Sequence, residues 1–349
     1  MKVLVIGGTK FIGKSIVDYS LKAGHEVVLF NRGETPSSRD LVLIKGDIEN
    51  IIDQKNEILQ HNFDIVVHCI AYTEKHAEDI RGILKYNKTK LIILSSCDSY
   101  ETFQGLNRQV DKAELPINED SPLSSMKYYW RDSTVKGSRA NKYDKNLLTD
   151  ILMDGYSNKE FNLIVFKLPL VFGPGDYQYP GRHGALIQRI LDKKEDLILS
   201  DREQCQVYTY GYIDNIGAAI VFSFNKEICN GKIYNLGDDK SRTRRKWAEM
   251  YAACANWSFN YHIIPEELIR KDKSFRNAPP QHLLINSSLY ARETGFKNPI
   301  ITEDAIRRTF EYAKKHPDIL GERPKYDEEE KLLSVYYSHL DKVYEGLNK

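Results

Sequence analysis

The chain has 349 residues, of which 41% are hydrophobic and 28% charged, and its 50 Lys and Arg residues against 49 Asp and Glu residues leave a formal net charge of +1. This balance is typical of a globular protein with one large domain or two ordinary ones, and it excludes disordered and fibrous chains. The small net charge gives no general attraction to nucleic acid or to an anionic membrane, so we expect neither partner.

Short apolar runs bounded by turn residues recur along the first half of the chain, from "KVLVIG" at residues 2–7 to "NLIVFKLP" at residues 162–169. Stretches with helical spacing lie between them, such as residues 11–24, which end in a glycine suited to a helix C-cap. Strands that are apolar on both faces and alternate with helices form parallel sheets covered on both sides. We therefore predict an α/β fold with a Rossmann-like doubly wound parallel sheet over residues 1–170.

The alternation of apolar runs and helical stretches changes at about residue 170, where "VFGPGDYQYPGRHG" is rich in Gly, Pro and Tyr. We predict a smaller, interleaved C-terminal domain over residues 171–320, with residues 205–240 returning to the first domain. Asp214 is expected to cap the helix that follows it.

Residues 321–349 form a predicted C-terminal helical tail with an acidic opening, which suits a helix N-terminus. Apolar residues fall on one face of this helix, namely Leu332, Leu333, Tyr336, Leu340, Val343 and Leu347. We expect this face to dock onto the protein's own body, with a homodimer contact as the alternative.

A glycine-rich loop, "GGTKFIG", follows the first predicted strand and opens the first predicted helix. Glycines at this point allow a tight turn and let backbone amides approach a pyrophosphate, which the positive helix end stabilises. In the usual G-x-x-G-x-x-G spacing the middle glycine would stand at position 10, where this chain has Lys10; its side chain either extends over the phosphates or points to solvent. We predict that the loop binds a dinucleotide through Gly7, Gly8, Thr9, Lys10, Phe11, Ile12 and Gly13.

The end of the second predicted strand favours one coenzyme over the other. A site that prefers NAD offers an acidic residue to the ribose hydroxyls here, whereas this chain has Asn31 and Arg32. Because a guanidinium suits a 2′-phosphate, the sequence favours NADP(H), with NAD(H) as the alternative. Asp47 and Ile48 follow the third strand and are expected at the adenine; the alternative for Asp47 is a helix-capping residue.

Several segments together resemble the extended short-chain dehydrogenase/reductases, the NAD-dependent epimerase/dehydratase family. They are "GGTKFIG", "NRG", "DIVVHCIA", "LSSCDSY", "KLPLVFGPGD", "YGYIDNIGAAI" and "YNLGD", and the first two resemble the atypical branch that includes chloroplast stem-loop-binding proteins. The resemblance implies that Ser96 hydrogen-bonds the reacting oxygen and that Lys145 binds the nicotinamide ribose. It further places Ile70 and Ala71 at the adenosine and phosphate side, and Leu168 and Leu170 beside the nicotinamide.

The stretch "NKYDK" at residues 141–145 departs from the family's Tyr-x-x-x-Lys motif, in which the tyrosine and lysine share one helix face. With Lys145 in register, the tyrosine position is taken by Asn141, which does not titrate. Tyr143 would point away from Lys145 on an ideal helix, unless the helix begins there and Tyr143 lies in its lead-in. Three interpretations stay open: a displaced catalytic site of Ser96, Tyr143 and Lys145, a cofactor-binding lysine with another acid or none, and two surface residues.

In relatives, arginines and aromatic residues of the second half bind the substrate. The resemblance therefore implies substrate contacts by Tyr177, Arg182, Tyr208 and Tyr210 within a substrate-binding region. The basic cluster from Arg242 to Lys246 is expected to be a solvated helix face, with a phosphate or RNA contact as the alternative.

Remaining features concern the compartment and the activity. Five scattered cysteines indicate free thiols and no metal site, and the sequence shows neither a signal peptide nor an apolar run of membrane-spanning length, so we expect a cytoplasmic protein. We predict an NAD(P)-dependent epimerase/dehydratase/reductase-like enzyme that acts on a nucleotide sugar or related polyhydroxylated small molecule by hydride transfer. The alternative is a catalytically silent NADP-binding module that acts as a redox sensor or RNA-associated protein.

Overall fold

The computed structural model describes residues 1–35, 40–103, 114–131, 135–136, 138–176, 183–269, 281–321 and 323–347. Its centre is a seven-stranded sheet in the order β11-β6-β5-β4-β1-β2-β3, and every neighbouring pair in it is parallel. This order, which reverses direction between β1 and β4, confirms the predicted doubly wound α/β fold. The strands are β1 (Lys2–Ile6), β2 (Glu26–Asn31), β3 (Val42–Lys45), β4 (Ile65–His68), β5 (Lys90–Ser96), β6 (Asn162–Leu168) and β11 (Lys232–Asn235).

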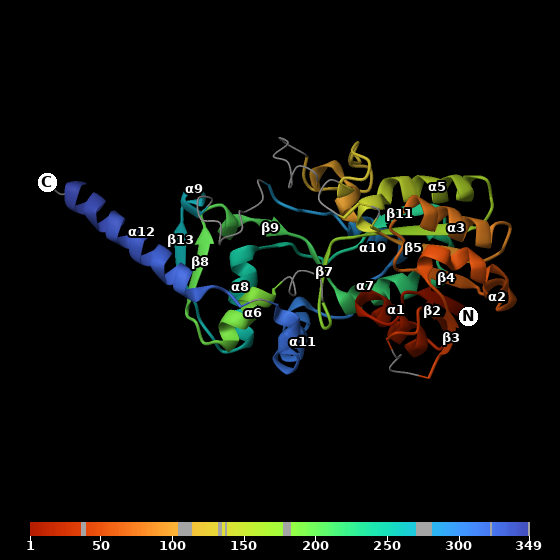
Figure 1. Ribbon diagram of the computed structural model, residues 1–349, viewed down its shortest axis with the longest axis horizontal. Coiled ribbons are helices and arrows are strands. Elements are labelled where there is room, and N and C mark those ends of the chain that lie inside the picture. Colours follow the sequence, from red (N-terminus) through yellow and green to blue (C-terminus); the bar gives the residue numbers. More distant parts are fainter. Residues whose placement is uncertain are drawn as a thin grey trace.

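Helices cover both faces of the sheet (Figure 1). Successive residues of β1 alternate between the faces: Val3 and Val5 pack in the core beneath α1 and α7, whereas Leu4 and Ile6 pack beneath α3 and α5. Because such a strand is buried on both faces, it is apolar at nearly every position, which explains the continuous apolar run in the sequence. The helices are α1 (Phe11–Lys22), α2 (Lys55–Gln60), α3 (Glu74–Leu84), α5 (Lys145–Ser157), α6 (Gly184–Leu191), α7 (Ile213–Phe222), α8 (Arg244–Cys254), α9 (Glu266–Ile269), α10 (Ser288–Thr294), α11 (Thr302–Lys315) and α12 (Tyr326–Leu347).

A second region lies beside the sheet and is built on short strand pairs (Figure 1). The pairs are β7 (Leu170–Phe172) with β10 (Tyr210–Tyr212), β8 (Asp196–Ser200) with β13 (Asn260–Ile264), and β9 (Val207–Tyr208) with β12 (Arg242–Thr243). The chain enters this region after β6 and returns to the large sheet at β11. None of the described helices is long and apolar enough to cross a membrane.

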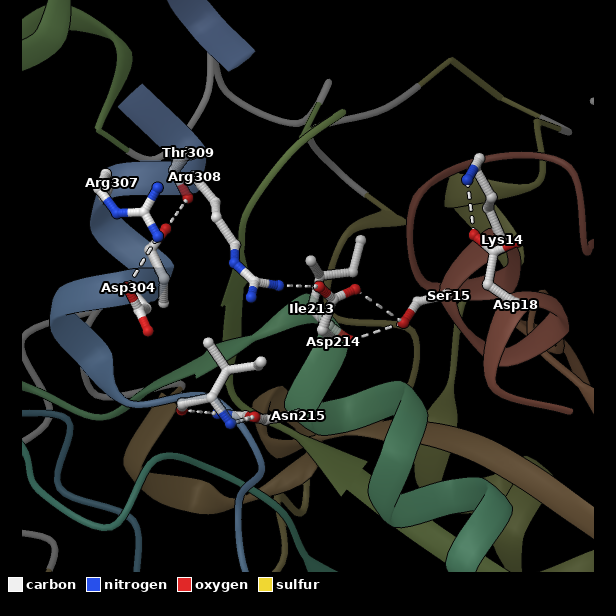
Figure 2. A network of polar contacts seen from close by, with 12 residues as sticks. Lys14, Ser15, Asp18, Ile213, Asp214, Asn215, Asp304, Arg307, Arg308 and Thr309 are labelled. Carbon is white, nitrogen blue, oxygen red and sulfur yellow. Dashed lines mark hydrogen bonds and ion pairs between the residues drawn. The ribbon is translucent and has the colours of Figure 1, made fainter. Parts of the chain in front are cut away.

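A polar network joins the helix after the glycine loop to the C-terminal part of the chain (Figure 2). Ser15 of α1 donates to the Ile213 carbonyl at 3.2 Å and to Asp214 Oδ1 at 3.4 Å, and Arg308 of α11 lies 3.6 Å from Asp214 Oδ2. The expectation that Asp214 caps α7 is wrong, because Tyr212 is the N-cap residue and Asp214 lies in the first turn. Asp214 instead holds α1 and α11 to the start of α7.

The tail helix α12 docks along only part of its length (Figure 1). Leu332, Leu333 and Tyr336 pack against the isoleucines of β8, β13 and α9, as expected. Farther along the helix, Val343 and Leu347 are 56% and 77% exposed, so the predicted docking of the whole apolar face is wrong for this half.

Candidate active site

The glycine loop between β1 and α1 has the geometry that a pyrophosphate requires. Gly7 has a φ of +85°, and a Cβ atom on Gly13 would lie 2.0 Å from the Gly7 carbonyl oxygen, so neither position tolerates a larger residue. Lys10, the N-cap residue of α1, is exposed and provides no side-chain cap to the first turn. Backbone amides at this helix end are therefore available to an anion.

The two sides of the expected dinucleotide site surround this loop. Ile70 packs directly against it, since its Cγ2 atom would lie 2.9 Å from a Cβ atom on Gly7. At the adenine side, Asn31 Oδ1 accepts from the Gly33 amide at 2.7 Å, and the exposed Arg32 guanidinium pairs with Glu34 at 2.8 Å. These residues fit a dinucleotide for two reasons. The glycines of the loop leave room for the phosphates, and the amides at the start of α1 have no side-chain cap.

Asp47 and Ile48 have structural roles at this edge of the sheet. Asp47 Oδ1 accepts from the Glu49 amide at 3.0 Å and caps the short 3₁₀ helix η1 (Ile48–Gln54), which matches the alternative given for it. The Ile48 side chain is buried in the core. Any contact of these two residues with adenine must therefore use the edge of the turn that they share.

The helix α5 begins at Lys145, which decides where Tyr143 points. Asp144 is the N-cap residue and accepts from the amides of Asn146 and Leu147 at 3.1 and 3.0 Å. Tyr143 has extended backbone and precedes the helix, so the 100° rotation per residue does not separate it from Lys145. The Tyr143 hydroxyl donates to Asp98 Oδ2 at 2.8 Å.

Asn141, in the register position of the family's tyrosine, faces another part of the protein. Its Nδ2 atom donates to the carbonyl oxygen of Arg131 at 2.9 Å, and it lies in the 3₁₀ turn η4 (Ala140–Lys142). Asn141 therefore fastens a neighbouring loop to the start of α5.

Lys145 is buried at the ends of two central strands. Its Nζ atom donates to the carbonyl oxygens of Ala71 and of Leu94, the latter at 2.9 Å. The ammonium lies 4.7 Å from the centre of the Tyr72 ring and 5.7 Å from that of Tyr143. Burial lowers the pKa of Lys145 to about 8, against the opposing effect of the Asp98 charge.

Burial raises the pKa of Tyr143, whereas it lowers that of Lys145. Desolvation, followed by the negative charge of Asp98, raises the pKa of Tyr143 well above its ordinary value. The nearby ammonium of Lys145 therefore does not lower the pKa of this phenol below its ordinary value. The phenol is a proton donor whose hydrogen bond already points to a carboxylate.

Ser96 ends β5 next to this pair. Its Oγ atom accepts from the Asp98 amide at 3.2 Å and caps the 3₁₀ turn η2 (Cys97–Ser99). Leu168 is the β6 residue paired with Ser96, and Leu170 begins β7 two residues later. Ser96, Asp98, Tyr143 and Lys145 thus gather at the carboxyl ends of β4, β5 and β6, where open α/β sheets bind ligands.

Residues expected to contact the substrate divide into two groups. Tyr177 and Arg182 lie outside the described residues. Tyr208 and Tyr210 are each only 5% exposed; the Tyr208 hydroxyl donates to Gln206 Oε1 at 2.8 Å, and the Tyr210 ring packs against Trp247. Both rings belong to the core of the second region.

Three cations of the basic cluster at the start of α8 pair with two glutamates. Arg244 pairs with Glu203 at 2.7 Å, and Arg245 and Lys246 both pair with Glu249 at 3.3 Å. This pairing is typical of a solvated helix face and gives little support to an RNA contact.

The sequence interpretation missed Asp98 and two aromatic residues around it, Tyr72 and Tyr129. Asp98 stands two residues after Ser96 in "LSSCDSY", and that position just beyond a central strand could have marked it as a site residue. Tyr72 and Tyr129 come from separate loops, and their rings lie 5.9 and 5.7 Å from the Tyr143 ring. No sequence spacing connects these loops.

A doubly wound parallel sheet with a glycine loop between its first strand and its first helix defines the class of dinucleotide-binding α/β folds. Residues 3–237 match the model of the NAD dependent epimerase/dehydratase family. Because this match covers more than half of the chain, the protein belongs to that family.

Curated relatives align over limited stretches. A chloroplast stem-loop binding protein of 41 kDa from Arabidopsis thaliana is 29% identical over 99 residues, and a UDP-glucose 4-epimerase from Lactobacillus helveticus is 30% identical over 142 residues. The alignments cover 24% and 37% of this chain, and they span 25% and 43% of those relatives.

Solved structures show the same fold over nearly the whole chain. A UDP-glucose 4-epimerase from Thermotoga maritima with UDP-glucose has a TM-score of 0.69 at 16% identity and covers 91% of this chain and 100% of its own. A dTDP-glucose 4,6-dehydratase from Bacillus anthracis in complex with NAD has a TM-score of 0.66 at 17% identity, with 91% and 98% covered.

Proposed function

We propose that the protein is an NAD(P)-dependent enzyme that acts on a nucleotide sugar, or a related polyhydroxylated small molecule, by hydride transfer. The observation that carries this proposal is the 2.8 Å hydrogen bond from the Tyr143 hydroxyl to Asp98 Oδ2 beside the buried Lys145. It supplies a proton path in a chain that has Asn141 in the register position of the family tyrosine. Relatives named for UDP-glucose and dTDP-glucose support this class of substrate.

The residues of the site have complementary roles in this proposal. Bound NAD(P) would accept a hydride from a carbinol carbon. Tyr143 takes the proton of the carbinol hydroxyl while its own proton passes to Asp98 Oδ2, so that the carboxylate is neutralised and the phenol again carries one proton. Ser96 donates a hydrogen bond to the reacting oxygen, and the Lys145 ammonium stabilises negative charge that develops on the phenol. Return of the proton and hydride reverses these steps.

We further propose NADP(H) as the preferred coenzyme, with NAD(H) as the alternative. Arg32 stands at the end of β2 where an acidic residue would favour NAD, and its pairing with Glu34 is exposed. An exposed ion pair contributes ~0–1 kcal/mol, so a 2′-phosphate would displace Glu34 readily. The family name and the NAD complexes among the solved relatives support the alternative.

Substrate binding is proposed for the region 171–320, through Tyr177, Arg182, Tyr208 and Tyr210. Because the rings of Tyr208 and Tyr210 are buried, contact with a substrate would need the second region to open.

Turnover of nucleotide sugars tests the proposal. Purified protein is incubated with UDP-glucose, UDP-glucuronic acid or dTDP-glucose and either coenzyme, while nicotinamide absorbance is followed and products are separated by chromatography. We expect conversion of at least one sugar. Coenzyme binding without conversion across the panel would instead support the silent module, which Asn141 in the tyrosine position favours. Absence of coenzyme binding would contradict both.

A further inference from the structure

Tyr72 lies in the loop after β4, and its ring contacts both Tyr143 and Lys145. The Lys145 ammonium lies 4.7 Å from the centre of this ring. The Tyr143 ring is stacked on it, with centroids 5.9 Å apart and an interplanar angle of 30°. The ammonium and the Tyr143 ring are themselves 5.7 Å apart. The three groups therefore form one compact triangle at the strand ends.

The peptide groups on either side of Tyr72 hold the same segment of the chain. The Ala71 carbonyl, which is bonded to the Tyr72 nitrogen, accepts a hydrogen bond from Lys145 Nζ. The Tyr72 carbonyl accepts from the amide of Asp144 at 3.0 Å. Asp144 is the N-cap residue of α5 and stands between Tyr143 and Lys145. The loop after β4 therefore fixes both the lysine ammonium and the residue at which the helix begins.

Tyr72 is itself held by a fully buried histidine of α3. The Tyr72 amide donates to His76 Nδ1 at 3.1 Å, and His76 Nε2 lies 3.2 Å from Glu49 Oε1. Burial lowers the pKa of His76, so its ring is neutral. Because Nδ1 accepts from an amide, the ring proton is on Nε2, which donates to the carboxylate. These bonds tie the Tyr72 backbone to the start of α3 and present its ring from a fixed scaffold.

A ring in this position does for Tyr143 and Lys145 what a helix face does in the family's motif. In Tyr-x-x-x-Lys, the spacing of four residues on one helix places the two side chains next to each other. Here Tyr143 precedes α5, so it shares no face of that helix with Lys145. The face of an aromatic ring attracts a cation, and a second ring stacks on it with an offset. Tyr72 makes both kinds of contact at once.

We infer that Tyr72 is a positioning residue, whose ring holds the Lys145 ammonium beside the Tyr143 phenol in place of a shared helix face. This inference rests on the proposed function, in which those two groups act together. The contacts that Tyr72 makes with them use its ring and its peptide groups. Phenylalanine at this position therefore keeps every one of these contacts, whereas leucine keeps the peptide groups and loses the ring.

Steady-state kinetics of Tyr72→Leu and Tyr72→Phe test the inference, with Tyr86→Leu as the control because Tyr86 is 77% exposed. We expect Tyr72→Leu to lower kcat about 10–100-fold, the effect of displacing catalytic groups by about 1 Å. The KM values for coenzyme and sugar should change less than about threefold. Tyr72→Phe should restore most of the wild-type kcat. An equal loss in both variants would assign the role to the hydroxyl, and a raised coenzyme KM at unchanged kcat would assign it to coenzyme binding; either result would overturn the inference.

Urea unfolding across the alkaline range supplies a measurement that needs no turnover. A ring face favours the charged ammonium, so its loss lowers the pKa of Lys145 in the folded protein further below the wild-type value of about 8. The pH at which stability begins to rise should therefore be about half to one unit lower in Tyr72→Leu than in the wild type and in Tyr72→Phe. The other ionisable groups that act on Lys145 are the same in all three proteins, namely Asp98, Cys69, His68 and His76.

The same onset in all three proteins would overturn the inference, because the ring would then not act on the ammonium. If the wild type converts no sugar with either coenzyme, the proposed function fails, and the pH of this onset alone decides whether Tyr72 holds Lys145.

Discussion

Tyr143 and Lys145, two residues apart in the chain, meet above the ends of β4 and β5 because α5 begins between them. The Lys145 ammonium lies 5.7 Å from the centre of the Tyr143 ring, although the same spacing within a helix would turn the two side chains apart. Asp144, the N-cap residue, fixes the point at which the helix begins. Tyr143 stands two residues after the register position of the family tyrosine. Because α5 begins between Tyr143 and Lys145, the two side chains meet despite this displacement.

Removal of the Tyr143 hydroxyl should abolish proton transfer and leave coenzyme binding intact. We expect Tyr143→Phe to lower kcat by about 10²–10⁴-fold, the usual contribution of a positioned acid–base group. Asp98→Asn should have a similar effect, because an amide does not take up the proton. Tyr86→Phe is the control, since Tyr86 is 77% exposed and far from the site. Steady-state kinetics that give Tyr143→Phe a wild-type kcat would rule out this role.

Gly13 should tolerate no side chain. In Gly13→Ala the new Cβ atom would lie 2.0 Å from the Gly7 carbonyl oxygen, so the loop must move and its amides lose the pyrophosphate. We expect at least a tenfold loss of coenzyme affinity, measured by calorimetry. Gly82→Ala in α3 is the control, because its Cβ would meet only Ile52 Cδ1 at 3.7 Å. Equal affinities of the two variants would disprove the pyrophosphate site.

Strand and helix order could be predicted from the sequence because the strands β1, β4, β5 and β6 are buried on both faces and most connections between strands of the large sheet contain helices. The glycine loop was recognisable for the same reason, since its position between strand and helix compensates for Lys10. The polar centre was less predictable. Whether Tyr143 reaches the site depends on the residue at which α5 begins, and Asp98 and Tyr129 meet it only through tertiary packing.

The tail shows a different limit of sequence interpretation. A helical face of apolar residues indicates that the helix packs against something, but periodicity does not say how far the contact extends. Leu333 and Tyr336 pack against the isoleucines of β8 and β13, whereas Val343 is exposed. Only the three-dimensional position of those strands determines where the contact ends.

Arg32 should determine coenzyme preference. In Arg32→Ala the 2′-phosphate loses a charge-assisted partner, so we expect NADP⁺ affinity to fall about tenfold or more while NAD⁺ affinity stays unchanged. Fluorescence titration with both coenzymes measures this difference. Lys45→Ala, at the end of the neighbouring strand β3, controls for the general loss of positive charge. An equal loss for both coenzymes, or a wild-type preference for NAD⁺, would contradict the proposed selectivity.

Lys145 should make stability depend on pH in the alkaline range. Burial lowers its pKa in the folded state from 10.5 to about 8, so between these values the unfolded chain binds more protons than the folded protein. Stability from this group therefore rises as pH increases from about 8 to 10.5, and its destabilising effect is complete below pH 8. Urea unfolding of wild type and Lys145→Met should show this rise in the wild type alone. Parallel pH profiles would indicate that Lys145 is not perturbed.

The anchor of α12 should depend on one buried ion pair. Arg189, itself 5% exposed, donates to both Glu329 oxygens at 2.5 and 2.7 Å. Removing one partner of a buried pair costs about 3–5 kcal/mol, because the other charge stays buried without its counter-charge. We therefore expect Glu329→Gln to lower the free energy of unfolding by several times more than the control Glu330→Gln.

The control removes an exposed pair between Glu330 and Lys194 at 3.1 Å, in which the side chains are 64% and 42% exposed. Such pairs contribute ~0–1 kcal/mol because water screens them. The two glutamates are neighbours on the same helix and carry the same charge, so effects on helix propensity and on the helix dipole cancel in the comparison. Urea unfolding that gives equal losses for the two variants would show that α12 is not anchored through Arg189 and depends on its other contacts, such as those of Leu332, Leu333 and Tyr336.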